Sequence, residues 1–129
     1  MVKTTDQAIF DEVILIGQEL GYDMYPSLPK DEVPYPFINL LDVQLLPKST
    51  KTHLKGKYSL ALTVWGREEE RILVSEMTAK LMQAVSAFQI GDWRVALHRQ
   101  GSTYHIYEER QSDVSTLWRS DMSLEFVIL

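Results

Sequence analysis

Three histidines and a run of three glutamates are the side chains in this sequence best suited to chemistry. His53, His98 and His105 show neither the i,i+4 helical spacing nor the HExxH motif of a metal centre. The glutamates at 68–70 open a predicted helix, where the positive end of the helix dipole favours acids without any catalytic role. The chain has no cysteine, which excludes thiolate nucleophiles and cysteine–zinc sites. The sequence therefore predicts no enzyme, no metal site and no cofactor.

One stretch differs from the rest of the chain in charge. Residues 47–57, PKSTKTHLKGK, contain four lysines, one histidine and no acid, whereas the whole chain has 13 basic and 18 acidic residues and a net charge of −5. Such a stretch could bind phosphate, nucleic acid or an acidic protein surface, including a second copy of this acidic chain. A protein contact is favoured, because the overall charge is negative and the stretch lacks interleaved aromatic residues. The residues expected to make it are Lys48, Lys51, Thr52, His53, Lys55 and Lys57.

The flanking patterns place this stretch at the tip of a β-hairpin. Residues 37–46, FINLLDVQLL, predict a strand that carries on one face Phe37, Asn39, Leu41, Val43 and Leu45. Residues 57–65, KYSLALTVW, predict a strand whose core-facing residues are Tyr58, Leu60, Leu62 and Val64. The connection is too long for a two-residue turn, so we expect an extended hairpin arm. Trp65 ends the second strand and is a candidate interface residue, since tryptophan is enriched at protein contacts.

The remaining segments complete an α+β pattern. A helix is expected from residues 4–5 to Leu20, stopped by Gly21, and a second over 67–88 with an apolar stripe from Leu73 to Phe88. Four prolines between 26 and 36 predict a loop with at most a short edge strand. Further strands are predicted over 93–100, 103–110 and 115–129, the last with Met122, Leu124, Phe126 and Ile128 facing inward. We expect one domain, residues 1–129, with a mainly antiparallel sheet and both helices on one face.

The sequence also bears on the location of the protein. Acids interrupt the apolar N-terminal stretch, which is unlike a signal peptide. No apolar run approaches the roughly 20 residues that cross a bilayer. We therefore expect a protein made in the cytoplasm, with no membrane partner.

Residues 35–85 resemble a family of phage proteins. The segment YPFINL, a polar loop with Lys51 and Thr52, and then KGKYSLALTVWGREEERILVSEMTAKLMQAV are similar to the tail terminators of long-tailed bacteriophages, also called tail-completion or head–tail joining proteins, of the lambda type. The order of elements carries the resemblance more than any single residue does, and Tyr35, Pro36 and Trp65 occupy matching positions. Residues 100–118 have no counterpart in this pattern, and their role is left open.

This resemblance implies a structural protein without enzymatic activity. Family members form a hexameric ring that caps the head-proximal end of the tail tube, ends tube polymerisation and joins the tail to the head connector. The implied partners are copies of the chain itself, the tube protein and the connector protein, with DNA passing through the lumen. The implied location is the virion, after assembly in the host cytoplasm. The alternatives are another neck or connector adaptor, a small nucleic-acid-binding or ligand-binding domain, or an enzyme whose residues converge only in space.

Overall fold

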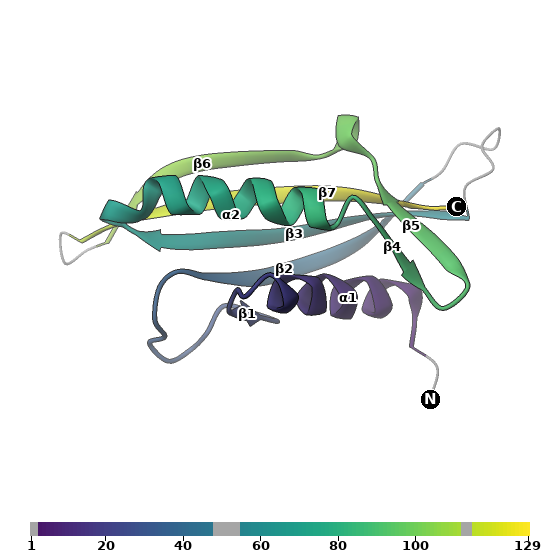
Figure 1. The fold of residues 1–129 in the computed structure, drawn as a ribbon, viewed down its shortest axis with the longest axis horizontal. Coiled ribbons are helices and arrows are strands. Elements are labelled where there is room, and N and C mark those ends of the chain that lie inside the picture. The colour runs from purple at the N-terminus through teal and green to yellow at the C-terminus, as the bar shows by residue number, and fades with distance from the viewer. Residues whose placement is uncertain (1–2, 48–54, 112–114) are drawn as a thin grey trace.

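A computed structural model describes residues 3–47, 55–111 and 115–129, which form two α-helices and a seven-stranded sheet (Figure 1). The elements are α1 (Thr5–Glu19), β1 (Met24–Tyr25), β2 (Phe37–Leu46), β3 (Gly56–Arg67), α2 (Arg71–Ala84), β4 (Ala87–Ile90), β5 (Trp93–Leu97), β6 (Thr103–Arg110) and β7 (Thr116–Ile128), with 3-10 turns at Glu68–Glu70 and Arg99–Gly101. The strand order is β1–β2–β3–β7–β5–β4, and β6 pairs with β7. Only the β1–β2 pair is parallel among the described strands, and both helices pack on one face, which confirms the α+β prediction.

Helix α1 and the edge strand after it follow the sequence prediction. Ile9 and Val13 are fully buried, and Gly21 ends the helix with a φ of 91°, a left-handed conformation that glycine adopts readily. Gly17 lies against Met24, and a Cβ at position 17 would come within 2.3 Å of the Met24 sulfur. The missing side chain therefore allows β1 to approach the helix closely.

Strand β2 does not keep the single alternation that the sequence predicted. Leu40 is fully buried, whereas Leu41 is 55% exposed. A β-bulge lies between Leu40 and Val43, because Leu40 pairs with Leu62 and Val43 pairs with Leu60. The bulge divides the five residues predicted to share a face into Phe37, Asn39 and Leu41 before it and Val43 and Leu45 after it. That part of the prediction was wrong, because one extra residue reverses the direction of every side chain that follows.

The second helix is shorter than the predicted span of 67–88. The glutamates at 68–70 form a 3-10 turn before α2, and the α-helix ends at Ala84. Phe88 lies in β4, not in the helical stripe, and its ring meets Phe126 edge-on with 5.6 Å between centroids. The cause is Gly91, whose φ of 59° turns the chain so that β4 pairs with β5. Phe88 therefore packs on the hydrophobic core as a residue of the sheet and not of the helix.

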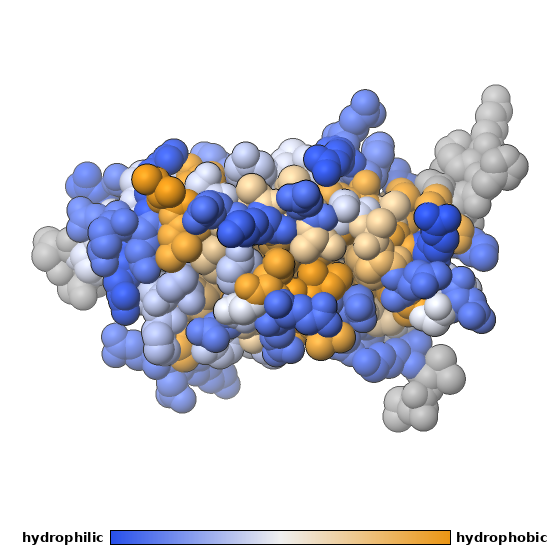
Figure 2. All heavy atoms as spheres, in the orientation of Figure 1, coloured by the Kyte–Doolittle hydropathy of each residue, from blue (hydrophilic) through white to orange (hydrophobic). Residues whose placement is uncertain are grey.

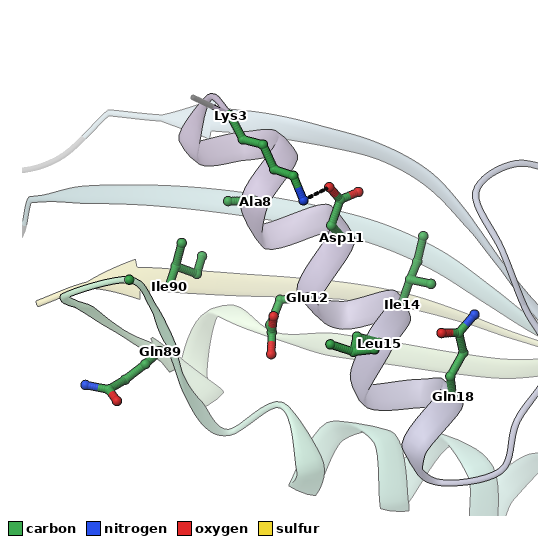
Figure 3. Close-up of a pocket in the computed structure, with 10 residues that line it drawn as sticks. Lys3, Ala8, Asp11, Glu12, Ile14, Leu15, Gln18, Gln89 and Ile90 are labelled. Carbon is green, nitrogen blue, oxygen red and sulfur yellow. Dashed lines mark ion pairs between the residues drawn. The ribbon is translucent and has the colours of Figure 1, made fainter. Parts of the chain in front are cut away.

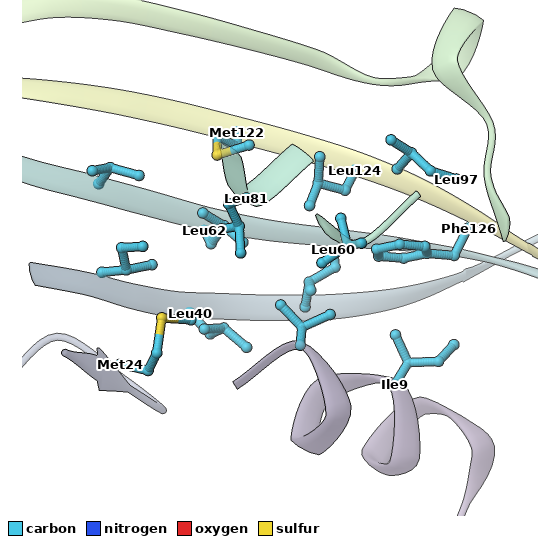
Figure 4. Close-up of a cluster of buried hydrophobic side chains, with 14 of the residues drawn as sticks. Ile9, Met24, Leu40, Leu60, Leu62, Leu81, Leu97, Met122, Leu124 and Phe126 are labelled. Atoms are coloured by element: carbon cyan, nitrogen blue, oxygen red, sulfur yellow. The ribbon is translucent and has the colours of Figure 1, made fainter. Parts of the chain in front are cut away.

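Strand β7 organises the sheet. It pairs with β3 along one edge over twelve register positions, and along its other edge with β6 at residues 116–123 and with β5 at residues 126–128. Its alternate residues Met122, Leu124, Phe126 and Ile128 are buried, as predicted. They join Leu60, Leu62, Leu81 and the inner residues of α1 in one apolar cluster between the sheet and the helices (Figure 4).

Candidate protein-interaction surfaces

The structure describes two of the six residues predicted to form the cationic contact. The other four lie outside the described residues: Lys48, Lys51, Thr52 and His53. Lys57 Nζ lies 3.7 Å from a carboxylate oxygen of Glu125, and Lys55 Nζ lies 5.7 Å from the centroid of the Trp93 ring. Both lysines therefore have a partner within their own chain. Their contact with a second protein stays a prediction.

Glu125 fixes the hairpin base to the crossover between β5 and β6. Its carboxylate lies 2.5 Å from His98 Nδ1, and its backbone N–H donates to Ser102 Oγ at 3.0 Å. Gly101 packs so closely on this carboxylate that a Cβ there would come within 2.6 Å. The Glu125 side chain is only 15% exposed. This cluster lies where β7 exchanges one neighbour for the other, and it acts as a structural anchor.

Trp65 faces the side of the sheet that neither α-helix covers. It is only 8% exposed, and its Nε1 donates to Asn39 Oδ1 at 2.7 Å. The Phe37 ring stacks beside it at 6.3 Å between centroids, and the Arg119 guanidinium lies 4.7 Å from its centroid. Most of the indole is therefore already in contact within the chain. The part of Trp65 that remains exposed contributes to the wall of a groove.

A polar network on the same face uses the region that the sequence left unassigned. Arg119 donates to Asp121 and to Glu109, each at 2.8 Å, while the Tyr107 hydroxyl donates to Asp121 at 2.6 Å. Thr63 Oγ1 also donates to Asp121, at 3.2 Å. Burial would raise the pKa of Asp121, but the hydrogen bonds from Tyr107 and Arg119 outweigh it and lower that pKa. The donors and acceptors of Arg119, Tyr107, Thr63 and Asp121 satisfy one another, so the network stabilises this face.

A groove of about 310 Å³ lies at the far end of the sheet from the lysine stretch. Its apolar and aromatic walls come from the proline-rich segment, from β2 and β3, and from the start of β7. They are formed by Leu28, Val33, Tyr35, Phe37, Trp65 and Leu117. The rings of Tyr35 and Phe37 lie 5.2 Å apart. Burial raises the pKa of the Tyr35 hydroxyl, and the nearby carboxylates of Glu32 and Glu109 raise it further.

Carboxylates surround this groove. Asp31 and Glu32 lie on its rim, and Glu68 and Glu69 line an adjoining cleft of about 890 Å³ that also includes Glu32. All four acids are exposed, and none forms an ion pair within the described ranges. Arg67 is the one basic residue among the described residues lining the cleft. This end of the molecule therefore combines apolar walls with unneutralised negative charge.

The helix side carries a different hollow, between α1 and the β4–β5 turn (Figure 3). It measures about 470 Å³, and its one charged pair, Lys3 with Asp11 at 2.7 Å, is neutralised internally. Figure 2 shows apolar surface on this view of the molecule. Leu15 of α1, which lines the hollow, is 47% exposed, and Ile72 of α2 is 78% exposed. The described residues that line the hollow include no serine, threonine, cysteine or histidine.

The described residues hold neither a metal-binding cluster nor a helix that could span a membrane. No group of three or more histidines and acids is placed to bind a metal ion there. Neither α-helix has the length and apolar character needed to cross a bilayer.

The fold resembles that of a virion component. No family model and no curated protein sequence matches this chain. A chain from the virion of a native gene transfer agent particle has a similar structure, with a TM-score of 0.62 over 96% of this chain and 93% of that one. The two sequences are 12% identical, so the likeness shows a shared fold. The shared fold extends over nearly the whole of both chains.

The groove and the network are the features that the sequence analysis missed. The groove joins residues from three separate parts of the chain, near positions 28–37, 65–69 and 109–117. The only signal in the sequence was the acids among the prolines, at Asp31 and Glu32. The network depends on β6 lying beside β7, a pairing that residues 100–118 do not reveal on their own.

Proposed function

We propose that this chain is a structural protein of a phage-like virion and, within that class, a tail terminator. The observation that carries the proposal is the likeness in fold, over nearly the full length of both chains, to a chain of a gene transfer agent virion. The resemblance of residues 35–85 to tail terminators comes from the sequence alone and favours the same class.

In this proposal copies of the chain form a closed ring at the head-proximal end of the tail tube. The ring ends tube polymerisation and presents its other side to the head connector protein. The chain works by binding and not by catalysis, which fits a surface where the titratable groups of the main network are hydrogen-bonded to one another. The net charge of −5 would let DNA pass through the lumen without strong attraction to its phosphates.

Native mass spectrometry over a concentration series, with negative-stain images of the most concentrated sample, tests the ring. Six copies of the 14.9 kDa chain give about 89 kDa, and a central hole would identify closed cyclic symmetry. The second measurement is tube length. We expect added chain to stop the growth of tail tubes assembled from the tube protein.

A neck adaptor is the second candidate, because likeness to a chain of a complete particle fits a position beside the tail as well as at its end. An adaptor would bind portal-side proteins and leave tube length unchanged. Unlimited tube growth in the presence of the chain, combined with binding to connector proteins, would replace the terminator proposal by this one.

A further inference from the structure

We propose that the acidic-rimmed groove receives the lysine-rich stretch, residues 47–57, of a second copy of this chain. The inference rests on the proposed function, in which copies of the chain assemble, and it names the two surfaces that meet. The groove is the one walled by Tyr35, Phe37, Trp65 and Leu117. Its occupant is identified by distance, by charge and by side-chain chemistry.

The distance excludes the chain's own stretch. Leu46 pairs with Lys57 at one end of the β2–β3 hairpin, and Phe37 pairs with Trp65 at the other. Lys57 and Trp65 lie eight positions apart in β3, which is roughly 26 Å at a rise of about 3.3 Å per residue. Figure 1 shows the end of β2 and the segment before β2 at opposite ends of the longest axis.

The connection between the two strands is too short to cover that distance. It comprises the residues between Leu46 and Gly56, which are anchored at both ends. The middle of such a connection lies at most about 17 Å from its anchors, at roughly 3.5 Å for each of about five residues. The stretch therefore cannot enter the groove of its own chain, so a stretch that enters the groove comes from a second copy.

Charge complementarity points to the same pair of surfaces. The groove rim and the adjoining cleft present four exposed acids without an ion pair in the described part of the chain: Asp31, Glu32, Glu68 and Glu69. The stretch has four lysines and no acid, whereas the rest of the chain has nine basic and 18 acidic residues. Lys57 lies beside Glu125 and Lys55 beside the Trp93 ring of the same chain, so the proposed contact uses Lys48 and Lys51.

The walls of the groove fit the chemistry of a lysine side chain. Its methylene groups pack on apolar and aromatic surface, while its ammonium group reaches a carboxylate at the rim. The faces of aromatic rings attract the ammonium group as well. The stretch also contains Leu54, an apolar residue that could occupy the part of the groove near Leu28.

The two surfaces lie at opposite ends, so the contact is heterologous. Each copy gives its lysine stretch to one neighbour and receives the stretch of another in its groove. Repetition of such a contact closes into a ring if the rotation between copies allows it, and otherwise extends into a filament. A closed ring is the form that the proposed function requires.

Cross-linking between cysteine variants tests the contact, and the natural chain helps because it contains no cysteine. Lys51→Cys and Glu32→Cys are mixed in equal amounts and treated with a short bismaleimide. The matched control replaces Glu32→Cys by Glu19→Cys, which removes another exposed acid, at the end of α1 and outside the groove. We expect the first mixture to form covalent dimers about tenfold faster, because contact raises the effective concentration of the two thiols. Equal rates in the two mixtures, or no cross-link at the highest concentration reached, would overturn the inference.

Charge reversal provides a second measurement. Lys48→Glu with Lys51→Glu should weaken self-association by about tenfold or more, and so should Asp31→Lys with Glu32→Lys. A mixture of the two double variants should recover association, because each new charge then meets its opposite. Failure of the mixture to recover, with both variants folded, would contradict the contact.

These experiments distinguish failure of the groove contact from failure of the proposed terminator function. If rings form and tubes stop growing while the groove variants assemble like the natural chain, the groove inference is wrong and the terminator proposal stands. If the cross-link forms but tube growth continues, the groove contact stands and the terminator proposal fails.

Discussion

Two adjacent leucines give the sharpest test of the fold. Leu40 is fully buried and pairs with Leu62, whereas Leu41, the next residue in the bulge, is 55% exposed. Replacing each by alanine removes the same atoms from neighbouring positions. The difference in unfolding free energy between the two variants therefore measures the direction of the β2 side chains.

The expected magnitudes follow from burial. Leu40→Ala removes three carbons from the core, which costs about 2.4 kcal/mol at ~0.8 kcal/mol for each buried group. The cavity left in the buried cluster adds to this, because Leu40 is fully buried there (Figure 4), so we expect a total of about 3–5 kcal/mol. Leu41→Ala leaves no closed cavity and exposes little new apolar surface, so we expect about 1 kcal/mol or less.

Urea unfolding followed by tryptophan fluorescence and circular dichroism measures both values. The samples should be dilute enough to be monomeric, because self-association would add to the apparent stability. A loss for Leu41→Ala equal to or larger than that for Leu40→Ala would refute the reasoning. It would mean that Leu41, and not Leu40, faces the apolar core.

Three other substitutions test local features. Gly66→Ala should destabilise the fold by about 1–3 kcal/mol in the same unfolding assay, because a Cβ would lie 2.4 Å from Val74 Cγ2, and an unchanged midpoint would contradict this contact. Asp121→Asn should reduce the loss of stability on acidification. The pKa of Asp121 is lower in the folded chain than its ordinary value of 3.8, so the ionised carboxylate stabilises the fold at pH values above 3.8. This stabilisation is lost as the pH falls through the native pKa. Its cost at pH 7 should be about 1 kcal/mol or less, because solvent screens the pair with Arg119. Tyr107→Phe should cost about 0.5–1.5 kcal/mol at neutral pH. It should also remove a loss of stability at alkaline pH, because the hydrogen bond to Asp121 raises the native tyrosine pKa above 10.0 and its contribution disappears as pH rises through that pKa. Unchanged pH profiles of unfolding in these two variants would contradict the network.

The sequence predicted those elements whose pattern is continuous. In β3 and β7 the side chains alternate without interruption, and Leu60, Leu62, Leu124 and Phe126 are buried as the alternation required. The prediction failed at β2 because Leu41 follows Leu40, so the apolar pattern fits either phase and does not mark the bulge.

The end of the second helix was mispredicted for a related reason. Phe88 continues the apolar stripe of α2 at helical spacing, but the turn at Gly91 draws residues 87–90 into a hairpin with β5. A pattern at one period cannot show that a neighbouring strand competes for the same residues. The hydrogen bonds of the β4–β5 pair decide the outcome.

The candidate interaction groove could not be predicted, because the tertiary fold creates it. Tyr35 and Trp65 lie thirty positions apart in the sequence, yet both form walls of one groove, together with Leu117. What the sequence did contain was the charge imbalance: a cationic stretch within an acidic chain. The structure adds the position of the opposite charge, at the other end of the sheet.

Copies of the chain are better suited to associate through the two ends of the sheet than through the sheet face that the helices leave uncovered. The reason is which polar groups already have hydrogen-bond partners. On that face the Asp121 carboxylate has three protein donors, and Trp65 and Asn39 bond to each other, so a partner would have to break existing hydrogen bonds in order to make its own. At the acidic end Glu32 and Glu69 have no such bonds to lose within the described chain, and a cationic partner would gain interactions at little cost. A chain with opposite charges at its two ends, and between them a face whose polar groups already have partners, is suited to head-to-tail contacts.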